Sequence, residues 1–107
     1  MTEISLTHSE GQILFSATGH ACFAKKGKDI VCAGISALCI SLLERIKALE
    51  NEGDTEIKKC VISDGCLILH FTKTKKAAEC CKTVLCGFEA IANSYPYYCR
   101  LFSSLDP

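Results

Sequence analysis

The sequence has no surplus of charge of either sign, because 12 Lys and Arg residues are balanced by 12 Asp and Glu residues. A protein that binds duplex nucleic acid normally carries a basic surplus that neutralises phosphates, so we expect no direct nucleic-acid binding. A disordered chain is normally poor in apolar residues, whereas 49% of this chain is hydrophobic. The composition therefore predicts a folded protein that does not work through bulk electrostatics.

Long apolar segments are also missing. The longest stretch without a charged residue, Ile30 to Leu43, has 14 residues, short of the ~20 that a helix needs to cross a bilayer. The first residues, Met-Thr-Glu-Ile-Ser, have neither the basic nor the apolar region of a secretory signal. We therefore expect a cytoplasmic protein without a membrane partner, and the length predicts a single domain over 1–107.

The motifs of several enzyme classes are absent: there is no P-loop, no dinucleotide-binding glycine pattern, no G-x-S-x-G and no H-E-x-x-H. The nine cysteines include no C-x-x-C pair, and their odd number prevents complete pairing. We therefore expect no metal and no cofactor, and free thiols that mostly serve as small buried hydrophobes. The cysteine count alone keeps a thiol redox or metal-handling protein open as an alternative.

What is present is an alternation of strand and helix patterns. Four runs are typical of strands: 3–9, 12–18, 56–62 and 66–72. Two helices are expected, one after Asp29 as N-cap and one over 75–94, and the tail 97–102 is a short strand or an extended segment. The order β-β-α-β-β-α predicts an α+β two-layer sandwich, with one mostly antiparallel sheet and two helices on one face.

The first helix is apolar almost all round over its first three turns, so we expect it to be central and buried there. The segment before it, 19–28, contains two glycines and three lysines and is expected to be an exposed, mobile loop. The second helix has a broad apolar stripe that offers surface for a partner.

Candidate chemistry lies on either side of that loop. His20 closes the second strand, and Cys32 falls in the first turn of the helix. A thiolate is stabilised there by unpaired N–H groups and by the helix dipole, and a nearby imidazole activates a thiol. The same N–H groups are candidates to hold an oxyanion. Asp29 is expected to orient His20 or to bind the substrate backbone. By spacing alone, however, a chance pairing among nine cysteines fits equally well.

The string GHA-x5-G-x-DIVCA-x2-SAL, over residues 19–38, resembles the signature of the ribosomal-processing cysteine protease family Prp. The matching residues are Gly19, His20, Ala21, Gly27, Asp29, Ile30, Val31, Cys32, Ala33, Ser36, Ala37 and Leu38. Gly34 is an apparent departure, because alanine is expected there.

The resemblance implies a cysteine endopeptidase that removes the N-terminal extension of a large-subunit ribosomal protein. It implies His20 and Cys32 as a catalytic dyad acting through a thioester, and it places Asp29, Ser36 and Gly19 near the site as orienting or substrate-binding residues. It also implies a homodimer. A non-catalytic ribosome-assembly or peptide-binding module of the same fold, in which Cys32 is merely buried, stays open as an alternative.

Overall fold

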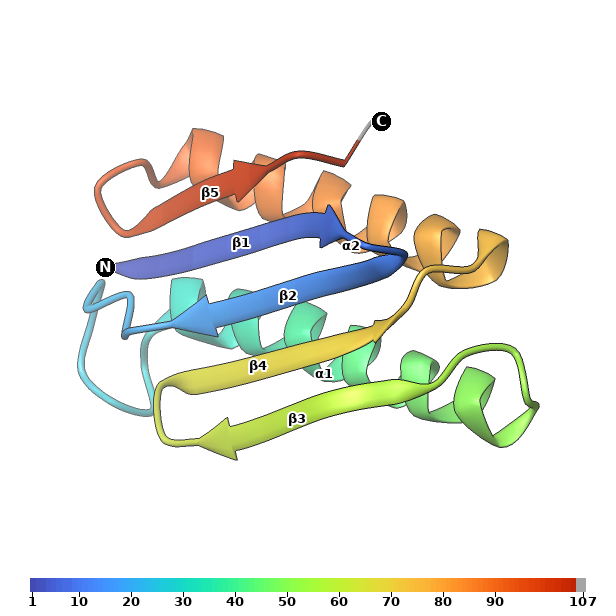
Figure 1. Ribbon diagram of the computed structural model, residues 1–107. Coiled ribbons are helices and arrows are strands. Elements are labelled where there is room, and N and C mark those ends of the chain that lie inside the picture. The colour runs from blue at the N-terminus through green and yellow to red at the C-terminus, as the bar shows by residue number, and fades with distance from the viewer. Residues whose placement is uncertain (106–107) are drawn as a thin grey trace.

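The computed structural model describes residues 1–105, which form one sheet backed by two helices (Figure 1). The elements are β1 (Thr2–Ser9), β2 (Gln12–Thr18), α1 (Ile30–Asn51), β3 (Ile57–Ser63), β4 (Cys66–Thr72), α2 (Lys75–Ser94) and β5 (Cys99–Ser103). The predicted α+β two-layer sandwich is confirmed. The tail, expected as a strand or an extended segment, forms the fifth strand.

The sheet has the order β3-β4-β2-β1-β5, and every neighbouring pair is antiparallel except β1 and β5, which are parallel. In the pair of β2 and β4, Thr18 lies opposite Cys66. The end of β2 therefore lies beside the β3–β4 turn, at the same side of the molecule as the start of α1 (Figure 1). This edge collects three segments that are far apart in the sequence.

One face of the sheet packs on the helices and forms the core. Alternate strand residues such as Leu6, Phe15 and Phe71 are fully buried. Phe15 stacks on Phe88 of α2, with ring centroids 5.8 Å apart. The apolar stripe of α2 is therefore used inside the chain and is not the free partner surface expected from the sequence.

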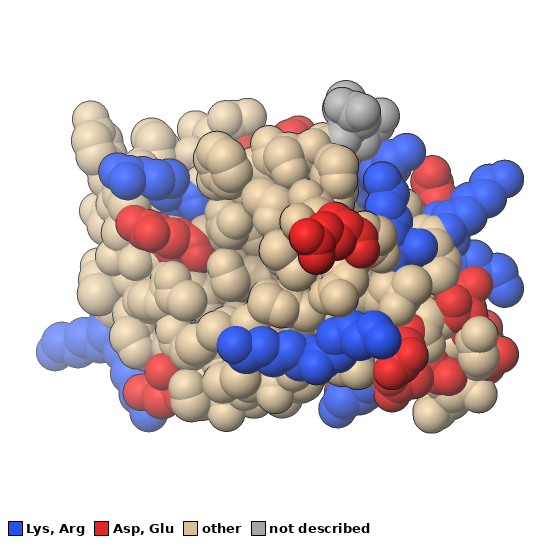
Figure 2. Space-filling model, viewed as in Figure 1, with Lys and Arg blue, Asp and Glu red and all other residues tan. Residues whose placement is uncertain are grey.

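Within residues 1–105, no helix lies over the opposite face of the sheet. The strand pairing places five residues opposite one another in a row across this face, one from each strand: Phe102, Ser5, Ser16, Ile68 and Val61. Figure 2 shows uncharged surface over much of this face, with charged side chains of both signs among it. Phe102 is 64% exposed there.

The expectation that α1 is buried almost all round is wrong. Val31 and Ile35 are buried, but Ile30 and Ile40 are 61% and 58% exposed. The reason lies in the edge strand β3, whose residues after Ile57 are all exposed. No further strand of the described residues lies beyond β3 to cover the flank of α1 on that side. An apolar periodicity does not distinguish a buried face from the wall of a cleft.

All nine cysteines are free, as expected, but only Cys39, Cys81 and Cys99 are buried. The prediction that most of them fill the core is therefore wrong. Separately, none of the helices in residues 1–105 has the length and apolarity needed to cross a membrane.

The buried thiols predict an alkaline loss of stability. Burial raises the pKa of Cys39 and of Cys81 from 9.0 to about 12. Between these values the unfolded chain releases protons that the folded chain retains, so the free energy of unfolding falls as the pH rises. The expected slope is about 1.4 kcal/mol per pH unit for each thiol. Urea denaturation in the presence of reductant measures it.

Cys81→Ala removes one of these thiols and should make the slope shallower, whereas Cys60→Ala, at an exposed position, should leave it as in the parent. Equal slopes for Cys81→Ala and the parent would contradict the prediction.

Candidate active site

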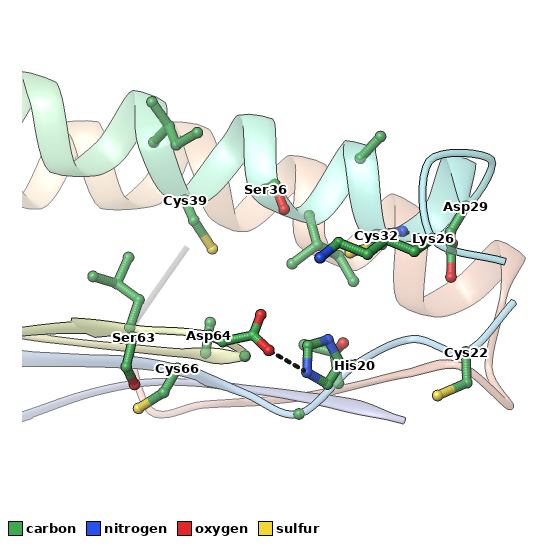
Figure 3. A pocket seen from close by; sticks show the side chains of 18 of the residues that line it. His20, Cys22, Lys26, Asp29, Cys32, Ser36, Cys39, Ser63, Asp64 and Cys66 are labelled. Carbon is green, nitrogen blue, oxygen red and sulfur yellow. Dashed lines mark hydrogen bonds and ion pairs between the residues drawn. The ribbon is translucent and has the colours of Figure 1, made fainter. Parts of the chain in front are cut away.

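A cleft of about 780 Å³ separates α1 from the edge of the sheet. Its lining comes from the loop before α1, from the exposed flank of α1 and from the β3–β4 turn. Figure 3 shows the labelled side chains on its two walls, with Cys32 and Ser36 on α1 and with His20 and Asp64 on the side of the sheet. Every site residue expected from the sequence lines this cleft: Gly19, His20, Asp29, Cys32 and Ser36.

Cys32 is the third residue of α1 and is half-buried. The helix begins where it does because Asp29 has an extended backbone and its Oδ1 accepts the Cys32 N–H at 2.9 Å. The predicted N-cap is confirmed. Hydrogen bonds from backbone N–H groups, that of Cys32 above all, lower the pKa of Asp29 below its ordinary 3.8, so the carboxylate remains charged at neutral pH.

The Asp29 carboxylate also has a consequence for the oxyanion. The sequence suggested that free N–H groups of the first helical turn hold it, but the N–H of Cys32 is donated to Asp29. A donor engaged with a carboxylate is not free for a second anion, so the N–H of Cys32 is not available to an oxyanion in this conformation. For the other N–H groups of the first turn the oxyanion role stays a prediction.

The loop before α1 is anchored at two points. Oδ2 of Asp29 accepts the N–H of Phe23 at 2.9 Å and that of Ala24 at 3.3 Å. The Phe23 ring packs edge-on against Tyr95 and Tyr98, with centroids 5.4 and 5.2 Å away. The exposure predicted for this loop is found from Cys22 to Lys28. Its mobility stays a prediction.

His20 follows β2 and is held at the sheet edge by its neighbour. Gly19 has φ +92° and donates its N–H to the carbonyl of Gly65 at 2.8 Å. A Cβ at position 19 would collide with the carbonyl oxygen of Met1, so both the backbone angle and the space require glycine. The side chain of His20 is 54% exposed, and its Nε2 lies 3.8 Å from Oδ2 of Asp64.

Cys32 and His20 thus lie on opposite walls of one cleft, the first on a helix and the second at the end of a strand (Figure 3). No hydrogen bond joins their side chains within residues 1–105; the polar contact of His20 is with Asp64. Catalytic contacts of this kind are often long without substrate. Ser36 lies one helical turn after Cys32 and is exposed to the same cleft.

Sequence reasoning missed Asp64 and Gly65 as neighbours of His20. These two residues form the turn between β3 and β4, and an Asp-Gly pair between apolar runs is typical of a hairpin. The missing information was the pairing of β2 with β4, which brings Gly65 beside Gly19. Periodicity predicts which residues form strands but not which strands pair, and nothing in the sequence of this turn indicates that it lies beside His20.

Beyond the two walls the cleft becomes apolar. Ile40 and Leu43 line it from α1, and Ile62 and Leu67 line it from the sheet. Ile40 and Ile62 are 58% and 63% exposed, and exposed apolar side chains gathered in one cleft favour a binding surface.

The cleft contains several thiols, which are possible metal ligands. Among the residues that the structure describes, no group of three or more His, Cys, Asp or Glu side chains is arranged to hold a metal ion.

A thiol at a helix N-terminus and an imidazole in the same cleft are the constituents of a thiol-dependent hydrolase. Over residues 1–100 the chain matches the model of a family described as Cysteine protease Prp. It therefore belongs to the cysteine protease Prp family and is a cysteine-type peptidase.

Individual relatives agree with this assignment. The ribosomal processing cysteine protease Prp of Mycoplasma genitalium is 35% identical over 85 residues, which cover 75% of this chain and 77% of that protein. The Prp of Bacillus subtilis is 39% identical over a shorter stretch of 46 residues, 43% of this chain and 41% of that protein.

The fold has a solved counterpart as well. The ribosomal processing protease Prp of S. aureus, in complex with a covalently linked product peptide, superposes with a TM-score of 0.79 at 24% identity, over 97% of this chain and 100% of that one.

The hydrogen bonds of Asp29 give a testable distinction between its charge and its capping role. Asparagine caps a helix about as well as aspartate does, whereas alanine does not. Asp29→Asn is therefore expected to melt at a higher temperature than Asp29→Ala, and circular dichroism measures both. Equal melting temperatures would contradict the capping role.

The dependence of stability on pH in the acid range tests the charge of Asp29 separately from its capping role. The fold lowers the pKa of Asp29 below 3.8, so its carboxylate contributes to the free energy of unfolding. This contribution is fully present above pH 3.8 and is lost as the pH falls through the lowered pKa. The parent and Asp29→Asn should therefore converge in stability as the pH falls below 3.8.

Proposed function

We propose that this peptidase removes the N-terminal extension of a large-subunit ribosomal protein, with Cys32 as nucleophile and His20 as general base. The observation that carries the proposal is the placement of these two side chains on facing walls of one cleft. The names of the relatives support the substrate class, since they are ribosomal processing proteases. A Prp structure with a substrate peptide supports a peptide as the occupant of the cleft.

In the first half of the reaction His20 takes the proton of the Cys32 thiol, and the thiolate attacks the carbonyl carbon of the scissile peptide bond. The oxygen of that carbonyl becomes an oxyanion. When the tetrahedral intermediate collapses, the C–N bond breaks and the His20 imidazolium gives its proton to the leaving amine. The product amine departs, and the other part of the peptide stays on Cys32 as a thioester.

In the second half a water molecule donates its proton to His20 and attacks the thioester carbonyl. Collapse of the second tetrahedral intermediate breaks the C–S bond, and Cys32 regains its proton from His20. The carboxylate product then leaves, and the enzyme has returned to its starting protonation state. The whole cycle uses only peptide and water, so it needs no metal and no cofactor.

The other residues have positioning or binding roles in this proposal. Both oxygens of Asp29 accept backbone N–H groups, which favours positioning of Cys32 over direct contact with the peptide. Ser36 presents its hydroxyl to the cleft one turn beyond Cys32, where it can hydrogen-bond the peptide backbone. Gly19 sets the direction of His20, and the apolar end at Ile40 and Ile62 accepts an apolar side chain of the peptide.

Residues 1–107 act as one domain in this proposal, and the reaction takes place in the cytoplasm, where ribosomal proteins are made.

The proposal predicts that Cys32→Ala abolishes cleavage of a peptide that spans the junction between the extension and the mature ribosomal protein. Loss of the nucleophile removes the covalent pathway, so kcat should fall by at least about 10³-fold. Product formation is followed by mass spectrometry. Cys86→Ala is the matched control, because Cys86 is an exposed thiol on α2 and does not line the cleft.

Cleavage by Cys32→Ala at the rate of the parent would refute Cys32 as nucleophile. Failure of the parent itself to cleave any such peptide would instead favour the non-catalytic peptide-binding module.

We also propose that the chain forms a homodimer, and the uncovered face of the sheet supports it. Phe102 is 64% exposed on this face, and Ile68 and Val61 lie in the same cross-strand row. Light scattering coupled to size exclusion is expected to give twice the mass of one chain. Phe102→Asp should shift the mass towards that of a monomer, and a parent that runs as a monomer at every concentration tested would contradict the proposal.

A further inference from the structure

We infer that the β3–β4 turn positions the imidazole of His20, with Gly65 as the surface on which the ring lies and Asp64 as the carboxylate that holds Nε2. This inference rests on the proposed function, because it assigns positioning residues to the proposed base. It adds a third segment to a site otherwise built from the end of β2 and the start of α1.

Gly65 is in direct contact with the ring. A Cβ built at position 65 would lie 2.7 Å from Nε2 of His20 and 3.1 Å from its Cε1. Both separations are below ordinary van der Waals distance, so any side chain at this position displaces the ring. The imidazole is the far end of an exposed side chain, so the ring moves more easily than the backbone does.

The backbone fixes this contact in place. The carbonyl of Gly65 accepts the N–H of Gly19 at 2.8 Å, one residue before His20. Next to it, Thr18 pairs with Cys66 in the sheet. The turn and the residue that carries the imidazole are therefore parts of one hydrogen-bonded ladder and keep their relative positions.

Asp64 completes the arrangement by charge. Its Oδ2 lies 3.8 Å from Nε2 of His20 (Figure 3). An imidazole has two nitrogens, and a carboxylate at Nε2 favours the tautomer with the proton on that atom. Nδ1 then remains as the acceptor for the thiol proton of Cys32. Since the Asp64 side chain is 92% exposed, solvent screens this interaction, and we expect the contact with Gly65 to have the larger effect.

The decisive comparison is between Gly65→Ala and Gly11→Ala. Both glycines lie in β-hairpin turns and have positive φ, +66° and +78°, so alanine brings similar backbone strain at both. A Cβ at Gly11 meets nothing within 4 Å, whereas at Gly65 it meets His20. Any difference between the two variants beyond the common strain therefore reports on the imidazole.

Gly65→Ala is expected to lower kcat by about 10- to 100-fold relative to Gly11→Ala, because a displacement of about 1 Å at a reacting group costs up to about 100-fold. KM should change less than kcat, because the added Cβ lies against the ring of His20 and the wall formed by α1 is unchanged. A loss of stability alone would lower both variants alike, and the folded fraction is checked by circular dichroism.

A second readout does not depend on the substrate. The rate of Cys32 alkylation by iodoacetamide, followed by peptide mass mapping, reports proton transfer to His20 in the free enzyme. His20→Ala defines the rate without the base. Gly65→Ala should lie closer to that rate, and Gly11→Ala closer to the parent.

Asp64 is tested by a charge series. Asp64→Asn should lower kcat by about two- to fivefold, and Asp64→Glu should restore part of it, because the carboxylate is regained. Glu79→Gln removes one member of an exposed ion pair on α2 and serves as the control for loss of a surface charge.

Equal kcat and equal alkylation rates for Gly65→Ala and Gly11→Ala would overturn the inference, as would a defect confined to KM. These outcomes differ from failure of the proposed function. If Cys32→Ala cleaved as fast as the parent, the proposed function would fail, whereas the alkylation rates would still decide whether the turn positions His20.

Discussion

The site depends first on the carboxylate of Asp29. One oxygen accepts the N–H of Cys32 and starts α1, and the other accepts the N–H groups of Phe23 and Ala24 and closes the loop. A single side chain thereby fixes both the position of the thiol and the path of the chain that leads from His20 to it. The arrangement engages the N–H of Cys32, so this donor is not free for the oxyanion of the proposed reaction. The hydrogen bond to Asp29 thus gives Cys32 a defined position and occupies its N–H.

The second constraint is the pairing of β2 with β4. Because these strands are antiparallel neighbours, the last residue of β2 meets the first residue of β4, and the β3–β4 turn lies beside His20. A sheet in which each hairpin paired only within itself would leave His20 without a neighbour on that side. The sheet order is therefore as much a part of the proposed site as the two side chains that carry the chemistry.

Features that depend on neighbours in sequence could be predicted, and those that depend on distant segments could not. The second helix was predicted over 75–94 and is found over Lys75–Ser94, since its stripe and its polar start are local. The third strand is displaced by one residue at each end, and a register irregularity lies between Ile57 and Lys59. The signature around His20 and Cys32 named the candidate residues, and the structure brings them to one cleft. The signature gave no indication of Gly65, whose proximity to His20 comes from strand pairing 45 residues along the chain.

The exposed flank of α1 is apolar although it is not part of the core. Ile30 and Ile40 have the spacing of core residues, yet they stand at a cleft because the edge strand β3 does not cover them. Both line the cleft and give its helical wall an apolar surface. A neutral protein with an apolar cleft is poorly suited to phosphate and well suited to an extended peptide, whose backbone needs hydrogen bonds and whose side chains need apolar surface. The neutral charge of the chain and the exposed apolar flank of α1 therefore both favour an extended peptide in the cleft.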